Sequence, residues 1–600
     1  MDNTSAEGRE IQQGKKQATM SAQEHVPGMG AIPLEQGYAF RVWAPNADSV
    51  AVVGDFNEWD EQANVLEREE SGNFYGVVTQ ARTGQEYQFA IRNGENTFMR
   101  IDPRAFKVTN SVGNGVLYNH EDFDWSGDEF ATPNQHELVI YETHIGSFVD
   151  NGDEHQPANL EDLTKKLDYL VGLNINCVEL MPLMEFAGDY SWGYNPANIF
   201  AVESSYGGPD ALKHFIKEAH ARGIAVIIDV VYNHFGPSDL SLWQFDGWQE
   251  NDKGGIYFYQ DWRSSTPWGD TRPDYGRQEV RDFISDNARM WLRDYHADGL
   301  RLDMTPYMRS KDGFSDDIPE GWTMMHEVGR VVREEFPGRI AIAEDLHNLA
   351  AVSSTEPDGG NMHAQWDSQF VHPVREALIT NDDASRNIDS VAAAVTHEYL
   401  NPFDRVIYTE SHDEVANGSA RVTTEVAGDN PDGWDAQKRA TLGACLVLSA
   451  PGMPMLFQGQ EFLEDEWFRD TVPLDWGQAW AFRDIARMFS DLIALRRNLD
   501  GSSAGLQGPV TRIHHQDNES KLLVFSRETL DQDAVLVAVN FSRTECAANV
   551  TIPEGHWKVR FNSDANTYST LFGNHETSDM EGPDAYLSLG PFSCVMFSRA

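Results

Sequence analysis

Residues 209–234, PDALKHFIKEAHARGIAVIIDVVYNH, contain the structural unit on which the predicted fold rests. The first fifteen residues carry apolar side chains at the spacing of an amphipathic helix, and the run that begins at Ile224 has the length and composition of a buried strand. That strand runs into three polar residues, Asp229, Asn233 and His234. A helix followed by a buried strand is the unit of a parallel sheet with crossover helices.

The same alternation extends over residues 135–498. Apolar runs of strand length are separated there by amphipathic segments, and the runs are LVIYETHI, NCVELMPL, IAVIIDVV, DGLRLD, IAIAED, HAQWDSQF, DRVIYTESHD and MPMLFQGQE. Eight is the number of strands that closes a (β/α)8 barrel, also called a TIM barrel. We therefore predict an α/β fold in which residues 135–498 form this barrel, with a loop insertion at 235–275 over its mouth.

The segments on either side of the barrel have a different pattern. Residues 31–120 and 499–600 contain short β-branched or alternating runs separated by turn residues, which predicts an N-terminal β-sandwich and a C-terminal all-β domain, also a β-sandwich. Residues 1–30 are polar and are predicted to be a flexible tail.

The chain is strongly acidic, with 95 Asp and Glu against 46 Lys and Arg and a formal net charge of -49. Such a surface repels nucleic acid and anionic lipid, so neither is expected as a partner. It suits a neutral substrate, or a salty cytoplasm in which repulsion between carboxylates is screened. The second possibility is the hypothesis of a halophilic or salt-tolerant host.

Other features of the sequence exclude further classes of protein. No apolar run is long enough for a transmembrane helix, and the N-terminus lacks the apolar core of a signal peptide, which favours a cytoplasmic location. The four cysteines lie far apart and form no C-x-x-C pair, which fits neither a disulfide framework nor a zinc site. We expect no metal and no cofactor, and a monomeric protein.

Charged residues stand at the carboxyl ends of several predicted strands. DGLRLD ends in Arg301 and Asp303, IAIAED reaches Glu344, and DRVIYTESHD ends in His412 and Asp413. Because the carboxyl ends of barrel strands share one rim, these carboxylates should converge there. Converging carboxylates without metal-binding spacing suit glycoside chemistry, in which one protonates the leaving oxygen and another attacks the anomeric carbon. Arg301 would then keep Asp303 ionised.

These segments identify a resemblance. DVVYNH, GLRLD, the glutamate of IAED and SHD resemble, in this order, the four signature segments of the α-amylase superfamily of glycoside hydrolases. The resemblance implies that Asp303 is the nucleophile, Glu344 the general acid/base and Asp413 the stabiliser of the distorted sugar. It further implies a substrate-binding set of Trp192, Tyr194, Asp229, His234, Arg301 and His412.

Within that superfamily, two groups of enzymes are similar to the chain. FRVWAPNADSVAVVGDFNEWD looks like a glycogen-binding module, and SWGYNP and SHDEV look like segments of glucan branching enzymes. HAQW and TPWGD are similar to maltooligosyltrehalose trehalohydrolase. The resemblance implies an α-1,4-glucan, such as glycogen or amylose, as substrate.

Three functions therefore stay open. The first is a 1,4-α-glucan branching enzyme, the second a hydrolase of amylase or trehalohydrolase type, and the third a non-catalytic glycogen-binding protein. Aromatic and apolar residues near the predicted mouth favour transfer to a sugar over hydrolysis, because they can stack an acceptor and exclude water. These residues are Trp243, Trp248, Trp262, Trp268, Met304 and Tyr307, of which Tyr307 is predicted to bind the acceptor.

Overall fold

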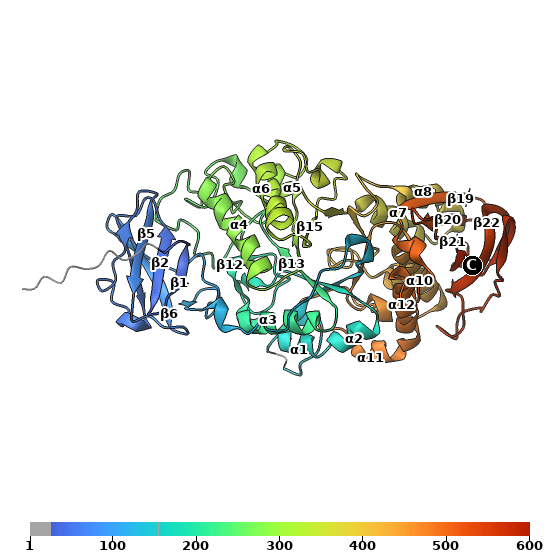
Figure 1. Cartoon of the computed structure of the whole chain (residues 1–600), viewed down its shortest axis with the longest axis horizontal. Coiled ribbons are helices and arrows are strands. Elements are labelled where there is room, and N and C mark those ends of the chain that lie inside the picture. The colour runs from blue at the N-terminus through green and yellow to red at the C-terminus, as the bar shows by residue number, and fades with distance from the viewer. Residues whose placement is uncertain (1–25, 154, 600) are drawn as a thin grey trace, which may run out of the picture.

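The computed structural model describes residues 26–153 and 155–599. The molecule is elongated, with the N-terminal strands at one end, the barrel in the middle and the C-terminal strands at the other end (Figure 1). The greater part of the predicted tail, residues 1–25, lies outside the described residues.

The N-terminal strands form two antiparallel sheets. One has the order β1-β2-β5-β4, and in the other β6 pairs with β3, β7 and β8. The strands are β1 Gly30–Pro33, β2 Tyr38–Trp43, β3 Ser49–Gly54, β4 Glu67–Arg68, β5 Asn73–Val78, β6 Glu86–Asn93, β7 Asn96–Arg100 and β8 Gly115–Val116. The ring centroids of Phe40 and Phe89, one from each sheet, are 6.4 Å apart in the shared core. The predicted sandwich is therefore confirmed.

The central region is a closed parallel barrel of the eight predicted strands. Its order is β10-β13-β14-β15-β16-β17-β18-β9, and β18 pairs with β9 to complete the ring. The strands are β9 Ile140–Thr143, β10 Cys177–Leu180, β13 Ala225–Val230, β14 Gly299–Leu302, β15 Ile340–Ala343, β16 Ala364–Trp366, β17 Arg405–Ile407 and β18 Met453–Phe457. Every residue of these strands is buried, which explains why they appear in the sequence as continuous apolar runs.

Helices and a small hairpin connect the barrel strands, and the last two helices follow the last barrel strand, β18. The helices are α1 Leu160–Thr164, α2 Leu167–Gly172, α3 Gly208–His220, α4 Gln278–Arg293, α5 Pro306–Arg309, α6 Pro319–Arg330, α7 Ser368–Ile379, α8 Ile388–Thr396, α9 Val422–Val426, α10 Trp434–Ser449, α11 Trp476–Ala481 and α12 Arg483–Arg496, and the hairpin is β11 Met184–Phe186 with β12 Pro196–Val202. The helix of the opening stretch, α3, ends where Gly223 adopts the left-handed conformation at φ 76°. The amide N–H groups of Gly223 and Ile224 then donate to the carbonyls of His220 and Ala219, which closes the helix and returns the chain to the barrel.

The strand predicted from HAQWDSQF is shorter than expected. HAQWDSQF supplies only β16, Ala364–Trp366, because α7 begins at Ser368. The carboxylate of Asp367 accepts a hydrogen bond from the amide N–H of Gln369 at 2.9 Å and thereby caps the helix.

The C-terminal strands form a single antiparallel sheet of six strands with the order β19-β20-β21-β24-β22-β23. They are β19 Val510–Asp517, β20 Leu522–Glu528, β21 Ala534–Asn540, β22 Cys546–Asn562, β23 Met580–Leu589 and β24 Ser593–Arg599. The all-β prediction is confirmed, but the strands belong to one hydrogen-bonded sheet and not to two. The first part of the long strand β22 pairs with β23 and its last part with β24, and residues of β20 to β24 share a core of their own.

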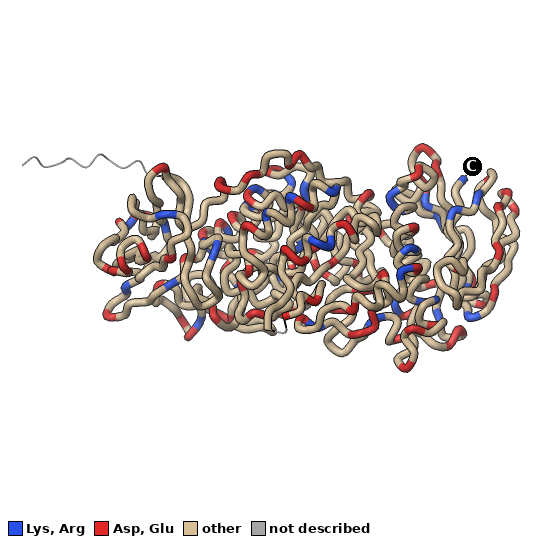
Figure 2. Tube along the Cα trace, turned by 90° about the horizontal axis from the view of Figure 1, so that it is seen from below, with Lys and Arg blue, Asp and Glu red and all other residues tan. Residues whose placement is uncertain are grey.

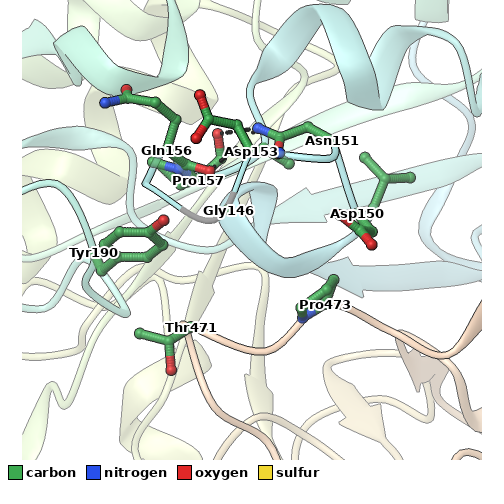
Figure 3. A pocket seen from close by; sticks show the side chains of 11 residues that line it. Gly146, Asp150, Asn151, Asp153, Gln156, Pro157, Tyr190, Thr471 and Pro473 are labelled. Carbon is green, nitrogen blue, oxygen red and sulfur yellow. Dashed lines mark hydrogen bonds between the residues drawn. The ribbon is translucent and has the colours of Figure 1, made fainter.

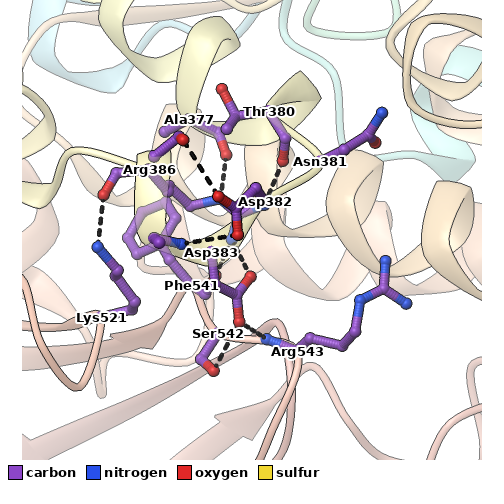
Figure 4. Close-up of polar contacts among 12 residues, drawn as sticks. Ala377, Thr380, Asn381, Asp382, Asp383, Arg386, Lys521, Phe541, Ser542 and Arg543 are labelled. Carbon is purple, nitrogen blue, oxygen red and sulfur yellow. Dashed lines mark hydrogen bonds and ion pairs between the residues drawn. The ribbon is translucent and has the colours of Figure 1, made fainter.

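Polar contacts fix the C-terminal sheet to the barrel helices (Figure 4). The carboxylate of Asp383 accepts from the hydroxyl of Ser542 at 3.0 Å and from the amide N–H of Arg543 at 2.8 Å. Arg386 donates to the carbonyl of Phe541 at 2.8 Å, and Lys521 donates to the carbonyl of Arg386 at 2.7 Å. These contacts attach the segment between α7 and α8 to the C-terminal sheet, although the two lie far apart in the sequence.

The N-terminal sandwich packs on the long loop between β13 and α4. Asp246 of this loop accepts hydrogen bonds from the amide N–H and the side chain of Asn46 at 2.9 and 3.0 Å. Arg100 donates to the carbonyl of Phe245 at 3.0 Å, and the rings of Trp43 and Tyr257 meet edge to face. The sandwich is thus attached to the loop insertion that sequence places over the barrel mouth.

Acidic residues are distributed along all three regions of the described chain and are not gathered in a single segment (Figure 2). Among the described residues, no helix combines the length and apolarity needed to cross a membrane. Cys177, Cys445, Cys546 and Cys594 are buried free thiols.

Candidate active site

The barrel brings the predicted charged residues together at the carboxyl ends of its strands. Asp229 on β13 and Arg301 on β14 are direct neighbours in the strand register. Asp303 and Glu344 directly follow β14 and β15, and all four side chains are buried. The chain therefore assembles these groups because parallel strands end at a common rim.

Arg301 links three carboxylates. Its Nη1 lies 2.7 Å from Oδ2 of Asp229 and 3.1 Å from Oδ1 of Asp303, and its Nη2 lies 2.8 Å from Oε2 of Glu344. The guanidinium also stacks on Trp366 of β16, 4.3 Å from the ring centroid. A buried cation in this position compensates negative charges that would otherwise repel one another.

Two further donors orient the candidate nucleophile and acid. Asn233 donates through Nδ2 to Oδ2 of Asp303 at 2.7 Å and to the Asp303 carbonyl at 2.8 Å. Met304 adopts a left-handed φ of 37°, an uncommon conformation for a residue with a side chain. Its amide N–H donates to Oε2 of Glu344 at 2.9 Å. The other oxygen of Glu344, Oε1, is buried and has no hydrogen-bond partner among the described residues.

The pKa values of Asp303 and Glu344 are both raised in the folded protein. Burial raises the pKa of Asp303 far above its ordinary value, and the neighbouring charge of Glu344 raises it further, against the stabilising effect of Arg301. Burial also raises the pKa of Glu344, and Asp413 adds to this effect. Two neighbouring buried carboxyls resist ionising together, so the pair loses both of its protons less readily than two carboxyls in water do.

His412 forms the second part of the site. Its Nδ1 lies 2.5 Å from Oε1 of Glu142 on β9, and its ring stacks on Tyr194 with centroids 5.0 Å apart. Burial disfavours the imidazolium, but the charges of Asp413 and Glu142 outweigh this and raise the pKa of His412 to about 9. At neutral pH His412 is therefore a cation that faces Asp413, its Nε2 3.7 Å from Oδ1.

Two half-buried aromatic residues and the exposed Asp413 surround His412. Tyr194 donates to Oδ2 of Asp229 at 2.6 Å, and Trp192 meets His412 edge to face at 5.8 Å. The side chain of Asp413 is 47% exposed and accepts a hydrogen bond from Asn417 at 3.2 Å. Asp413 is thus the most accessible of the three candidate carboxylates.

His234 and Tyr307 lie on the side of the loop insertion. The Nε2 of His234 is 2.9 Å from the Tyr194 carbonyl, and its ring stacks on Trp268 at 4.5 Å and 14°. Burial lowers the pKa of His234 to about 4, so it is neutral at pH 7. Tyr307 is half-buried and meets Trp268 edge to face at 5.1 Å.

Sequence reasoning missed three residues of the site. Glu142 is the polar partner of His412 Nδ1, and the ring of Trp366 stacks under the guanidinium of Arg301. The third residue, Glu179 on β10, is buried, and neither of its carboxyl oxygens is hydrogen-bonded to the described residues. Burial raises the pKa of Glu179 well above its ordinary value, against the opposing charge of Arg301. A glutamate inside an otherwise apolar strand was the available signal for Glu142 and Glu179, because such a residue is rarely buried without a role.

A cavity of about 260 Å³ lies next to the segment that carries Trp192 and Tyr194. Asp150, Asn151, Asp153 and Gln156 lie on one side of it, and Tyr190, Thr471 and Pro473 lie on the other (Figure 3). Among residues 26–153 and 155–599, no group of three or more His, Cys, Asp or Glu is arranged to hold a metal ion.

Comparison with known families identifies the regions of the chain. Residues 103–263 and 237–472 match the family described as "Alpha amylase, catalytic domain". The chain belongs to the α-amylase family. Residues 28–105 match carbohydrate-binding module 48, described as the isoamylase N-terminal domain, and residues 513–600 match the C-terminal all-beta domain of α-amylases.

Individual relatives match over nearly the whole chain. The 1,4-alpha-glucan branching enzyme of Salinibacter ruber is 30% identical over 580 residues, which cover 90% of each chain. The branching enzyme of Corynebacterium diphtheriae is 29% identical over 92% of this chain and 76% of its own. The chain is thus an enzyme of this family, a glycosyltransferase or glycoside hydrolase, and the alternative of a non-catalytic glycogen-binding protein is not supported.

Solved structures show the same fold. The pullulanase of an Anoxybacillus species, in complex with maltotetraose, matches with a TM-score of 0.77 at 22% identity, over 96% of this chain and 88% of its own. The pullulanase of Bacillus acidopullulyticus matches with a TM-score of 0.75 at 19% identity, over 95% of this chain and 75% of its own. The architecture of barrel and flanking β domains is therefore shared with other family members.

Proposed function

We propose that this protein is a 1,4-α-glucan branching enzyme. The observation that carries the proposal is the 30% identity to a branching enzyme over 90% of both chains. The site supplies the two carboxylates, Asp303 and Glu344, that a retaining transfer requires, both in contact with the guanidinium of Arg301.

The first half-reaction would cut an α-1,4 link. An oxygen of Asp303 attacks the anomeric carbon, while Glu344 gives its proton to the leaving glycosidic oxygen, so that a covalent glycosyl ester forms on Asp303. Double displacement needs the two carboxyl groups about 5–5.5 Å apart, and a single guanidinium in contact with both supports such a distance. The cationic His412 and the accessible Asp413 would bind hydroxyls of the distorted ring.

The second half-reaction would form an α-1,6 link. Glu344, now ionised, accepts the proton of a 6-hydroxyl on a second glucan chain, and that oxygen attacks the anomeric carbon and releases Asp303. Tyr307 and Trp268 would stack the incoming chain and exclude water.

The cellular setting is a further part of the proposal. A net charge of -49 and an uncharged glucan substrate are compatible, and buried free thiols suit a reducing cytoplasm. We propose a monomer that works there at elevated salt.

Incubation with amylose tests the proposed activity. Branching lowers iodine staining and creates α-1,6 linkages with little gain in reducing ends, whereas hydrolysis raises reducing ends. A wild-type protein that releases reducing ends and makes no α-1,6 linkages is a hydrolase, and the branching proposal would then be wrong.

A further inference from the structure

An aromatic row leads outward from the site on the side of the candidate acid. His234 stacks on Trp268, and Trp268 meets Tyr307 at 5.1 Å. Beyond Tyr307 lie His347 and then Phe314, whose rings stack with centroids 4.5 Å apart at 24°. The row is drawn from the loops that follow β13, β14 and β15, and the last two of these loops carry Asp303 and Glu344.

The backbone between the rings keeps the row continuous. Gly313 adopts a left-handed φ of 85°, and a Cβ at this position would lie 3.7 Å from the His347 ring and 3.8 Å from the Tyr307 ring. The backbone of Gly313 therefore lies between the two rings, and no side chain separates them.

The outermost ring is exposed although its surroundings are fixed. Phe314 is 87% exposed. Asp312 accepts hydrogen bonds from the amide N–H groups of Phe314 and Ser315 at 3.0 and 2.7 Å, which hold the turn. Nδ1 of His347 lies 3.0 Å from Nη2 of Arg309, and Arg309 is itself paired with the buried Asp345 at 2.8 Å. An apolar ring presented to solvent on a fixed turn is prepared for a ligand, because little conformational freedom is lost when the ligand binds.

The position of the row relative to Glu344 indicates its occupant. The general acid must reach the oxygen of the departing chain, so the part of the glucan beyond the cut bond lies beside Glu344. His347 follows Glu344 by three residues and borders the same side. The same space receives the acceptor chain in the second half-reaction. A neutral ligand with apolar faces is also the kind that a chain of net charge -49 does not repel.

We propose that Phe314, supported by His347, is a remote glucan-binding platform that holds the departing and the acceptor chain several sugar units from Asp303. The flat apolar face of a glucose ring would lie on the exposed face of Phe314, and Trp268 and Tyr307 would hold the units nearer to the cut. This inference rests on the proposed α-glucan substrate, and it adds a site that short chains cannot reach.

The test compares Phe314→Ala with a matched control. Tyr586, an aromatic residue of β23 that is 67% exposed in the C-terminal sheet, gives the control variant Tyr586→Ala. Turnover is measured as the sum of reducing ends and α-1,6 linkages, so that it reports chain cleavage whichever activity the enzyme has. Amylose and a short maltooligosaccharide serve as substrates.

Phe314→Ala should raise the KM for amylose about three- to tenfold, the range expected for loss of one stacking contact. The KM for the short substrate and both kcat values should stay within about twofold of wild type, because the platform does not touch the reacting atoms. Phe314→Trp should restore the KM for amylose, and Tyr586→Ala should leave it unchanged.

The outcomes separate the two proposals. A raised amylose KM without α-1,6 linkages would support the platform and overturn the branching activity. Branching with an unchanged amylose KM would overturn the platform alone. An amylose KM that is unchanged while Phe314→Ala abolishes self-association in sedimentation would assign Phe314 to contact between copies of the chain, and would also overturn the platform.

Discussion

Replacing Asn233 with alanine should move the acidic limb of the pH–rate profile to higher pH. Asn233 is fully buried and donates through Nδ2 to Oδ2 of Asp303 at 2.7 Å. This hydrogen bond favours the charged carboxylate and lowers the pKa of Asp303 against the opposing effect of burial. Removal of the donor therefore raises that pKa.

The size of the shift follows from the charge of the acceptor. A buried hydrogen bond to an ionised group contributes about 1.5–3 kcal/mol, and about 1.4 kcal/mol corresponds to one pKa unit. The pKa of the nucleophile should rise by about one to two units. Asp303 must be ionised to attack, so activity is present above its pKa and is lost as the pH falls through it. Below the shifted limb, kcat/KM should fall about 10- to 100-fold.

The assay is kcat/KM on amylose between pH 4 and 9, and another buried asparagine provides the control. Asn287 is also fully buried and accepts from the Tyr232 hydroxyl at 2.7 Å, away from the carboxylates. Asn287→Ala should lower stability without moving the acidic limb. The reasoning is refuted if the limb of Asn233→Ala stays at the wild-type pH, or if Asn287→Ala moves it equally.

Three other outcomes are expected. Asp303→Asn should remove nearly all turnover on amylose while the circular dichroism spectrum stays unchanged, because an amide is a poor nucleophile, and wild-type rates in this variant would exclude the assignment. The pKa of His412 is raised to about 9 in the folded protein, so His412 binds a proton more tightly when the chain folds. Its contribution to stability should be complete below about pH 6.5 and should disappear as the pH rises through 9. The difference in urea midpoint between wild type and His412→Gln should therefore shrink between these two pH values. The melting temperature should rise with potassium chloride up to molar concentration because screening relieves repulsion among the 95 carboxylates; a melting temperature that is flat or falls with salt would contradict this.

The barrel strands could be predicted because their burial is uniform. A strand covered on both faces, such as β13, appears in the sequence as an unbroken apolar run, and its polar end marks the rim. The end of β16 could not be found in this way, because Asp367 acts as a helix cap and apolar residues continue beyond it into α7. In the C-terminal region, apolar or alternating runs mark the strands but do not show whether their partners belong to one sheet or two. The long β22 pairs with both of its neighbours, β23 and β24.

The charged residues of the site also differ in how far the sequence alone can predict them. Asp303, Glu344 and Asp413 follow strand ends, where the topology of the barrel alone brings them together. Glu142 acts through His412, a partner 270 positions further along the chain. Contacts of this kind depend on which strands become neighbours when the barrel closes, and local pattern carries no such information.

The choice between transfer and hydrolysis depends on contacts of the same long-range kind. Water is present at about 55 M, so a transferase must hold its acceptor at a large effective concentration and keep water out. Half-buried Tyr307 reaches this position because α5 follows directly on Asp303 and because Trp268, from another loop, packs against its edge. Tyr307→Ala should therefore lower the ratio of α-1,6 linkages to reducing ends on amylose while total cleavage changes less, since the carboxylates keep their partners. If the ratio is unchanged or rises in this variant, Tyr307 does not hold the acceptor, and exclusion of water must come from other residues of the loop between β13 and α4.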